Sequence, residues 1–271
     1  MAYDWRTAEC ELSSGYDHSR PAAARLWALW SGGKDYNLAD CAFGDQVRER
    51  FPQISSIARH RLAFRSRVVR VLAGEYDIDQ FLVVGVDMPM HDEVHRVAWS
   101  VRAGVRVVYA DSDELVMAYA AALFGGESAR GCGFVRAGLN HPRAVLEGAA
   151  ATLDLSRPVA VLLINSLDLL SDPVAVAALA AFRGGLPTGS YIALSHLTAE
   201  HDRRMVALGH MCADMAPGPL GIRSPAELEA FCTGMVMVPP GLVPAPMWRP
   251  EPSPWPFPAE VDLWCGVGAL P

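Results

Sequence analysis

The sequence predicts an α/β protein built on a mostly parallel sheet with helices on both faces. Short β-branched runs alternate with helical segments, and these runs are apolar at nearly every position. Strands that are apolar throughout are typical of a parallel sheet that is buried on both sides. The chain has 271 residues, of which 51% are hydrophobic and 20% are charged, so it can bury a sheet of this kind.

A helical segment precedes the predicted sheet. Residues 21–75 show helical periodicity, with Pro21 suited to a first turn and Ser31-Gly32-Gly33 suited to a helix end. The last helix of this segment has a basic face that is typical of a solvated surface, formed by Arg59, Arg61, Arg65, Arg67 and Arg70. We therefore divide the chain into a helical N-terminal cap, residues 1–75, and an α/β domain, residues 76–271.

Strands and helices are expected to alternate after Gly74. The predicted strands are Gln80–Val86, Val105–Ala110, Gly133–Ala137, Pro158–Ile164 and Ser190–Ser195. The predicted helices between them are His91–Ala103, Asp113–Phe124, Pro142–Thr152 and Pro173–Phe182. Two helices, Ala199–Asp214 and Pro225–Phe231, and two strands, Met235–Val238 and Val261–Val267, complete the pattern. A proline-rich hairpin loop, Pro239–Pro258, separates the last two strands.

Charge and cysteine usage limit the possible classes of function. The net charge of −7 argues against nucleic acid as a partner, because phosphate binding requires a basic face. The six cysteines, Cys10 among them, form no Cys-x-x-Cys pair and are expected to be reduced thiols. The sequence shows neither a signal peptide nor a run of roughly 18 apolar residues that could span a membrane. We therefore expect a cytoplasmic protein that binds neither nucleic acid nor membranes.

Ligands of such sheets bind beyond the carboxyl ends of the strands, so the residues directly after each strand are the candidates. Gly85 ends an apolar strand as in a nucleotide-binding turn, but Gly85-Val86-Asp87 lacks the dinucleotide fingerprint, which excludes NAD and FAD. Asp111 follows the second strand, where an acid accepts hydrogen bonds from a ribose, although it also suits a helix N-cap.

No metal site and no hydrolase site are expected. His91 and His95 have a spacing that metal ligands use, but the HDEVH sequence lacks the glutamate position of the zinc-protease motif, and no third ligand is evident. The sequence also lacks a Gly-x-Ser-x-Gly nucleophile elbow.

Segments along most of the chain resemble the actinobacterial S-adenosylmethionine-dependent methyltransferase-like proteins. These segments are RPAAARLWALWSGGKDYNLAD, FLVVGVDMP followed by EVH, VVYADSDELV, PVAVLLINSLDLLSDP, PTGSYIALSHLTAE and PGLVPAPMWRP. They extend from Arg20 to Arg249. The resemblance implies a class I methyltransferase fold, which is a seven-stranded, mostly parallel sheet with an antiparallel last strand, together with a helical N-terminal cap.

The chain departs from the family pattern at the cofactor site. The family has an Asp-x-Gly-x-Gly type turn after the first strand, where this chain has Val83-Val84-Gly85-Val86-Asp87. The Ala-Asp-x-Arg-Asp-Pro run of the family is replaced by residues 137–142, and Asp168 stands where the family often has histidine. Each lost polar contact costs about 1–3 kcal/mol. The resemblance therefore implies a degraded site, with Gly85 and Asp111 as the remaining cofactor-binding residues.

These departures favour a natural-product biosynthetic enzyme that requires no cofactor. Asp87, Asp168 and Asp45 would be the catalytic carboxylates, which bind an amine substrate and remove a proton from it. The substrate would be bound by Lys34, Asp35, Asn165 and His196, and Arg25 is a further candidate for holding the leaving group. In this respect the chain resembles the aziridine-forming methyltransferase-like enzyme of azinomycin-type biosynthesis, in which an amine displaces a leaving group within one molecule.

Two alternatives are left open by the sequence. The first alternative is a genuine S-adenosylmethionine-dependent methyltransferase of small molecules. The second is a non-catalytic methyltransferase-like subunit. A homodimer, or a complex with a second methyltransferase-like chain, is compatible with each of these functions.

Overall fold

The structure is a computed structural model that describes residues 19–90, 92–213, 220–252 and 261–271. Parts of the predictions therefore lie outside the described residues. These parts are residues 1–18 of the cap with Cys10, the metal candidate His91, Asp214 at the end of a predicted helix, and residues 253–258 of the proline-rich loop.

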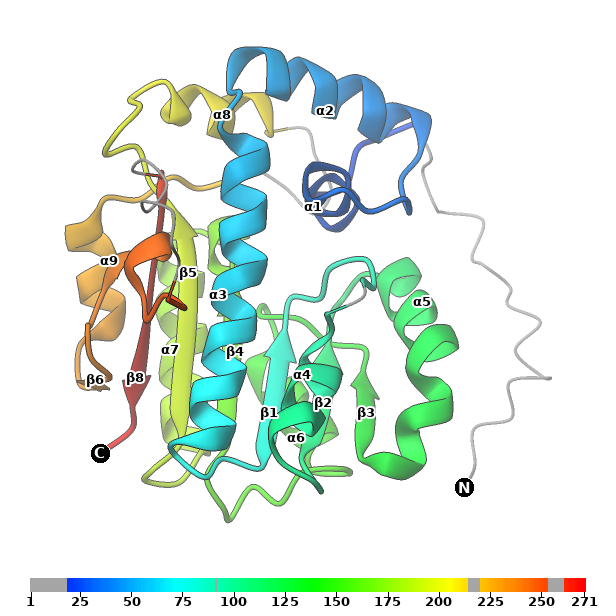
Figure 1. The fold of residues 1–271 in the computed structure, drawn as a ribbon, viewed down its shortest axis with the longest axis vertical. Helices are drawn as coiled ribbons and strands as arrows, with labels where there is room; N and C mark the ends of the chain where they lie inside the picture. The colour runs from blue at the N-terminus through cyan, green and yellow to red at the C-terminus, as the bar shows by residue number, and fades with distance from the viewer. Residues whose placement is uncertain (1–18, 91, 214–219, 253–260) are drawn as a thin grey trace.

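The described strands form one mixed sheet (Figure 1). The strands are β1 (Gln80–Val84), β2 (Arg106–Ala110), β3 (Cys132–Val135), β4 (Ala160–Ile164), β5 (Tyr191–Leu197), β6 (Val236–Met237), β7 (Val243–Pro244) and β8 (Leu263–Ala269). Their order is β3-β2-β1-β4-β5-β8-β6, and the short β7 also pairs with β8. Strands β1 to β5 are parallel, whereas β8 runs antiparallel to β5. The predicted class I methyltransferase sheet is confirmed, and β7 is an addition to it.

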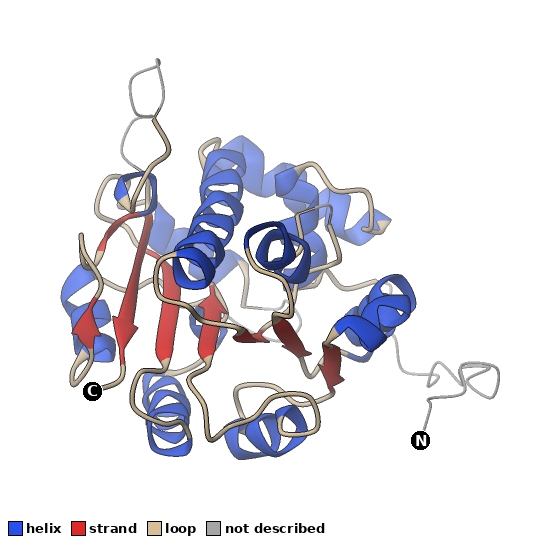
Figure 2. Cartoon of the chain, turned by 60° about the horizontal axis from the view of Figure 1, so that its bottom comes forward, coloured by secondary structure: helices blue, strands red, loops and turns tan. Residues whose placement is uncertain are grey.

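The helices cover both faces of this sheet (Figure 2). The α-helices are α1 (Ala23–Ser31), α2 (Leu38–Arg50), α3 (Ile54–Gly74), α4 (Val94–Val101), α5 (Glu114–Phe124), α6 (Pro142–Ala149), α7 (Asp172–Gly185), α8 (Met205–Met211) and α9 (Pro225–Cys232). Three short 3₁₀ segments are η1 (Gly125–Arg130), η2 (Leu167–Leu169) and η3 (Ala245–Met247).

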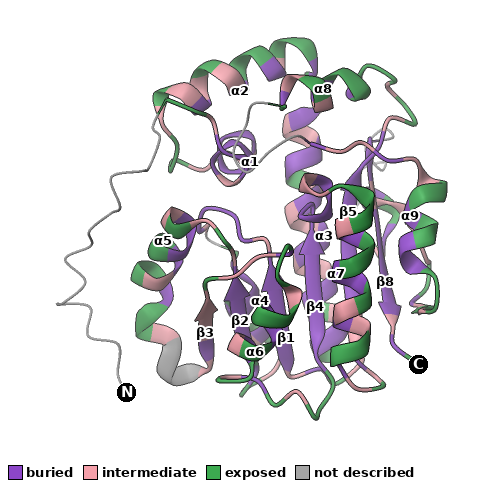
Figure 3. Ribbon diagram, turned by 180° about the vertical axis from the view of Figure 1, so that it is seen from behind, coloured by how far each residue is buried: buried purple, intermediate pink, exposed green. Residues whose placement is uncertain are grey.

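Alternation along the strands divides the core into two layers. In β1, Phe81 and Val83 pack into the cluster formed with α1 to α5, whereas Leu82 and Val84 pack into the cluster formed with α6, α7 and α9. This division follows from the period of two that side chains have along a strand. Figure 3 shows buried strands at the centre and exposed outer surfaces on α2, α5 and α7. The near-continuous apolar runs of the sequence are therefore explained by burial on both faces.

The largest error in the predicted elements is at the start of α8. The sequence predicts a helix from Ala199, but α8 begins only at Met205. The carboxylate of Asp262 accepts hydrogen bonds from the backbone N–H groups of His201 and Asp202 at 2.9 and 3.0 Å. These two groups are held by a side chain that lies far away in sequence, so the backbone there does not form the expected helical turn.

The loop between α1 and α2 is closed by a buried ion pair. Arg25 Nε donates to Asp40 at 2.6 Å, and Asp40 is fully buried. Asp40 also accepts from the backbone N–H groups of Ala22 and Asn37 at 3.0 and 2.8 Å. Asn37 caps α2 in return. The RLWALWSGGKDYNLAD segment is thus a folded unit whose arginine and aspartate hold its two helices together.

The turn after β1 requires glycine. Gly85 has a φ of +84°, a left-handed conformation that residues with a Cβ rarely adopt. A Cβ on Gly85 would lie 2.4 Å from Cβ of Ser166, in the turn after β4. Gly85 N–H donates to the carbonyl of Ala110 at 3.0 Å. The turns after β1, β2 and β4 therefore approach one another closely at this end of the sheet.

Among the described residues, none of the helices combines the length and the apolar character that crossing a membrane would require.

Replacing Asp40 by alanine should lower the free energy of unfolding by about 3–5 kcal/mol, because Arg25 would keep its buried charge without this carboxylate. Urea unfolding measures this change. The matched control is Asp45→Ala, since Asp45 is exposed and pairs with Arg48 on the surface of α2. The control should change stability by less than about 0.5 kcal/mol, and a similar loss in both variants would contradict the role of the buried pair.

Replacing Gly85 by alanine should destabilise the protein by about 1–3 kcal/mol more than replacing Gly104 by alanine. Both glycines have a positive φ, but a Cβ on Gly104 would meet no atom within 4 Å. The difference between the two urea unfolding curves therefore isolates the contact with Ser166. Equal losses would show that backbone strain alone makes glycine necessary at position 85.

Candidate functional site

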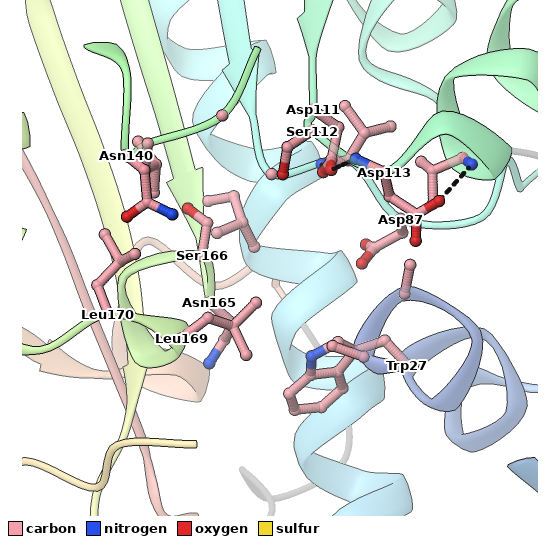
Figure 4. A pocket seen from close by; sticks show the side chains of 18 of the residues that line it. Trp27, Asp87, Asp111, Ser112, Asp113, Asn140, Asn165, Ser166, Leu169 and Leu170 are labelled. Atoms are coloured by element: carbon pink, nitrogen blue, oxygen red, sulfur yellow. Dashed lines mark hydrogen bonds between the residues drawn. The ribbon is translucent and has the colours of Figure 1, made fainter. Parts of the chain in front are cut away.

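A cavity of about 400 Å³ lies at the carboxyl ends of β1 to β4 (Figure 4). Its lining comes from the turns after these four strands and from α1, α3, α5, η2 and α7. The lining residues are Ala23, Ala24, Trp27, Arg61, Gly85, Val86, Asp87, Asp111, Ser112, Asp113, Val116, Gly138, Leu139, Asn140, Ile164, Asn165, Ser166, Leu169, Leu170, Ser171 and Val174. The volume falls within the range of small-molecule sites, and the location agrees with the rule for α/β sheets.

Asp111 stands at the end of β2 and lines the cavity, as the sequence predicts for a ribose-binding acid. Oδ2 accepts from Val86 N–H at 2.7 Å, and Oδ1 accepts from Asp113 N–H at 2.8 Å. Burial raises the pKa of Asp111 to about 6, although these two hydrogen bonds oppose the rise. Each carboxylate oxygen can accept a further hydrogen bond, so Asp111 can still bind a hydroxyl group.

Asp87 lines the cavity in an ion pair. Its Oδ1 accepts from Arg61 Nη2 at 2.6 Å, and its Oδ2 lies 3.9 Å from Arg65 Nη1. The guanidinium of Arg61 lies 4.7 Å from the centre of the Trp27 ring and also donates to the carbonyl of Ile164 at 3.3 Å. Asp87 is thus in the predicted place, with one oxygen bonded to Arg61 and the other beyond hydrogen-bond distance of Arg65.

The prediction that the arginine face of α3 is solvated is wrong for Arg61 and Arg65. Arg61 and Arg65 are 2% and 5% exposed, respectively. They lie four residues apart, on the side of α3 that carries the buried Phe64 and Val68. This shared face is the signal in the sequence that could have revealed Arg61 as a cavity residue.

Asp168 and His196 are placed outside the cavity, so the prediction that they line it is wrong. Both are fully buried, and Asp168 Oδ1 lies 2.9 Å from His196 Nε2. Arg223 Nη1 lies 2.5 Å from the same His196 nitrogen. Asp168 follows β4 by one turn of η2, which directs its side chain to β5 rather than to the cavity.

Asn165 lines the cavity, as predicted, and Asp168 holds its side chain by a hydrogen bond. Asn165 Nδ2 donates to Asp168 Oδ2 at 2.6 Å, and Asn165 Oδ1 accepts from Ser195 Oγ at 2.7 Å. Asn165 also has a φ of +55°, an uncommon conformation for a residue other than glycine. The amide is therefore held in one orientation at the edge of the cavity.

The remaining predicted residues from the cap are not among the lining residues. Lys34 and Asp35 are exposed in the loop between α1 and α2, and Asp45 pairs with Arg48 on the surface. Arg25 is buried against Asp40. The cap contributes Ala23, Ala24 and Trp27 to the cavity instead, because the buried face of α1 points to the sheet.

The three serines of the lining were not among the predicted site residues. Ser112, Ser166 and Ser171 come from the turns after β2 and β4. Ser166 is 6% exposed, and its Oγ has no hydrogen-bond partner among the described residues. An unpaired buried hydroxyl at a cavity wall is available to a ligand.

His95 belongs to a separate buried cluster. Its Nδ1 lies 2.7 Å from the hydroxyl of Tyr109, and its Nε2 lies 2.5 Å from Glu127 Oε2. Burial lowers the pKa of His95 to about 4. One donor atom each from His95, Glu127 and Cys132 lies within 4.8 Å of the others. The short distance between nitrogen and oxygen indicates direct contact of the two side chains.

Comparisons with known proteins agree with this architecture. A family model described as S-adenosyl methyltransferase matches residues 9–271. A DUF574 family protein from Streptomyces avermitilis is 30% identical, with a TM-score of 0.86, and the match covers 94% of this chain and 99% of that chain. A methyltransferase candidate from Thermobifida fusca YX is 31% identical, with a TM-score of 0.88, over 95% of this chain and 97% of that chain.

More distant structures show the fold alone. The S-adenosylmethionine-dependent methyltransferase SibL is 13% identical, with a TM-score of 0.51, and the match covers 96% of this chain and 72% of that chain. A comparison with curated proteins gives no match. The family model spans nearly the whole sequence, and the two similar structures match 94% and 95% of this chain. The chain therefore belongs to the S-adenosyl methyltransferase family.

Proposed function

We propose that this protein is a methyltransferase of small molecules that binds S-adenosylmethionine in the cavity at the carboxyl ends of β1 to β4. The observation that carries the proposal is the meeting of Gly85, Asp111 and Ser166 at one cavity wall. These residues supply a turn without a side chain, a carboxylate and an unpaired hydroxyl. Membership of the S-adenosyl methyltransferase family supports the proposal, and it favours methyl transfer over cyclisation.

The residues present fit an adenosyl cofactor in several respects. Asp111 can accept hydrogen bonds from ribose hydroxyl groups, and Asn140, in the loop after β3, has both donors and acceptors for the edge of a base. Gly138 lies close to Ser112, since a Cβ there would be 3.0 Å from Ser112 Oγ. When bound, S-adenosylmethionine would supply an activated methyl group. Its positive charge suits a cavity that contains Asp87, Asp111 and Asp113.

The methyl acceptor would pack against the apolar part of the lining. Trp27 of α1 faces Leu169 and Leu170 across the cavity (Figure 4). Neither histidine nor lysine lines the cavity among the described residues, so a proton acceptor there would be a carboxylate. The acceptor is therefore a small molecule with an apolar body.

A second candidate is the intramolecular displacement by an amine, without a methyl donor, in natural-product biosynthesis. Asp87 favours it, because this carboxylate lines the cavity in the turn after β1. Of the three predicted catalytic acids, only Asp87 lines the cavity, so the ring-forming step would depend on it.

Association with a second methyltransferase-like chain, or as a homodimer, stays a prediction that light scattering of the purified protein would test.

S-adenosylmethionine should bind to the wild-type protein with a dissociation constant of about 100 micromolar or lower, as measured by titration calorimetry. Asp111→Ala should weaken binding at least about tenfold, because the ribose hydroxyl groups lose a charged acceptor. Asp45→Ala is the control and should bind as the wild type does. Absence of binding to a folded wild-type protein would reject the methyltransferase proposal and favour the second candidate.

The affinity for S-adenosylmethionine should fall as the pH is lowered from 7.5 to about 5. The reason is that Asp111 has a pKa of about 6 in the free protein, and only its ionised form accepts hydrogen bonds at both oxygens. Asp111→Asn should bind more weakly at pH 7.5 and lose most of this dependence. If the variant keeps the full dependence, the assignment of this pH dependence to Asp111 is wrong.

A further inference from the structure

We propose that Asp87 makes the α3 side of the cavity a subsite for a primary ammonium group that has no carboxylate beside it. The ammonium group belongs either to the tail of an adenosyl ligand or to a separate amine substrate. The first case rests on the proposed function, whereas the second does not. In both cases, the turn after β1 selects a ligand with a positively charged group.

The charges that line the cavity favour a cation. Among the described lining residues, Asp87, Asp111 and Asp113 are acids, and Arg61 is the base. Asp113 caps α5 through Oδ1, which accepts from the N–H groups of Leu115 and Val116, whereas Asp87 is the carboxylate that lies against α3. A negatively charged group of a ligand would be repelled by these carboxylates.

Arg61 is already neutralised at this place. Asp87 Oδ1 occupies its Nη2 at 2.6 Å, and the Trp27 ring lies 4.7 Å from the guanidinium carbon. The Nε and Nη1 atoms of Arg61 are buried, and they have no partner among the described residues. A ligand carboxylate would have to displace Asp87 or Trp27 to reach them. Asp87 thus takes the position that a ligand carboxylate would otherwise take on Arg61.

The second guanidinium nearby is not free for a ligand either. Arg65 Nη1 lies 3.9 Å from Asp87 and 3.8 Å from Glu93, and Arg65 Nη2 donates to the carbonyl of Asp92 at 2.9 Å. Arg65 is not among the residues that line the cavity. The positive charges of Arg61 and Arg65 are therefore directed to carboxylates of the protein itself.

Asp87 offers an ammonium group an acceptor on the α3 side of the cavity. Asp87 uses one oxygen for Arg61 at hydrogen-bond distance, whereas its other oxygen is 3.9 Å from the nearest guanidinium nitrogen. Ser166 Oγ is an independent sign of a ligand, because it is buried at the cavity wall without a partner. Ser166 lies against Gly85, two residues before Asp87, so the two acceptors belong to adjoining turns.

The test compares adenosyl ligands that differ only in the tail, by titration calorimetry on the wild-type protein. S-adenosylmethionine carries an ammonium and a carboxylate, whereas decarboxylated S-adenosylmethionine carries the ammonium alone. We expect the decarboxylated ligand to bind at least about tenfold more tightly. Asp87→Asn should abolish this preference, and Asp87→Gly should reverse it, because Arg61 would then be free for the ligand carboxylate. Asp45→Asn is the charge-matched control and should keep the preference.

A second titration identifies the source of the ammonium group. 1,3-Diaminopropane is added to the protein in the presence of 5′-methylthioadenosine, which has no tail charge. Binding of the diamine that is lost in Asp87→Asn and kept in Asp45→Asn assigns the subsite to a separate amine substrate. Tighter binding of the decarboxylated adenosyl ligand assigns it to the tail of the donor.

Failure of the proposed function is distinguishable from failure of this inference. If none of the adenosyl ligands binds, the methyltransferase proposal fails, and titration with the diamine alone still decides whether Asp87 binds an ammonium group. The inference is overturned if S-adenosylmethionine binds as tightly as its decarboxylated form or more tightly, and the diamine does not bind in an Asp87-dependent manner.

Discussion

The ion pair between Arg61 and Asp87 connects four of the parts of the protein that form the cavity. Arg61 comes from α3, and Asp87 comes from the turn after β1. Arg61 also donates to the carbonyl of Ile164 at the end of β4 and packs against the ring of Trp27 in α1. Both charged side chains are almost completely buried, so removing either partner would leave a charge without compensation. The position of the cap over the sheet and the charge of the cavity depend on the same contact.

The cavity wall at the end of β4 is held by a buried polar network. Asn165 is oriented by Asp168 and Ser195, and Asp168 in turn lies against His196. A carboxylate that is fully buried without touching the cavity acts on a ligand only through the residue that it orients. The two acids that the sequence made the main catalytic candidates therefore differ in role, since Asp87 faces the ligand space and Asp168 supports its wall.

The family accounts for the fold and for the general location of the site, whereas the chemistry depends on individual side chains. Gly85 and Asp111 keep the close turn and the carboxylate that suit an adenosyl ligand. Asp87 places a negative charge in the same cavity and neutralises the charge of Arg61. The proposed ammonium subsite follows from this carboxylate and not from the fold.

The sequence by itself determined the order of the strands and helices, the two-faced burial of the sheet, the glycine turn after β1 and the acid after β2. These features follow from local patterns, because side-chain periodicity and turn conformation are set by residues close together in the chain. Strand ends were predicted within a few residues, but the start of α8 was not. Asp262, some sixty residues away, holds the N–H groups of His201 and Asp202, which precede the helix.

Only the tertiary structure decided which polar residues meet at the cavity. Arg61 and Arg65 read as a solvated face because a pattern of charges along one helix does not show what packs against it. Asp168 and His196 follow strands at the correct edge, yet η2 and the pairing of β5 with β8 turn them into the interior. Proximity to a strand end is a property of sequence position, whereas access to the cavity depends on side-chain direction and on the elements that cover it.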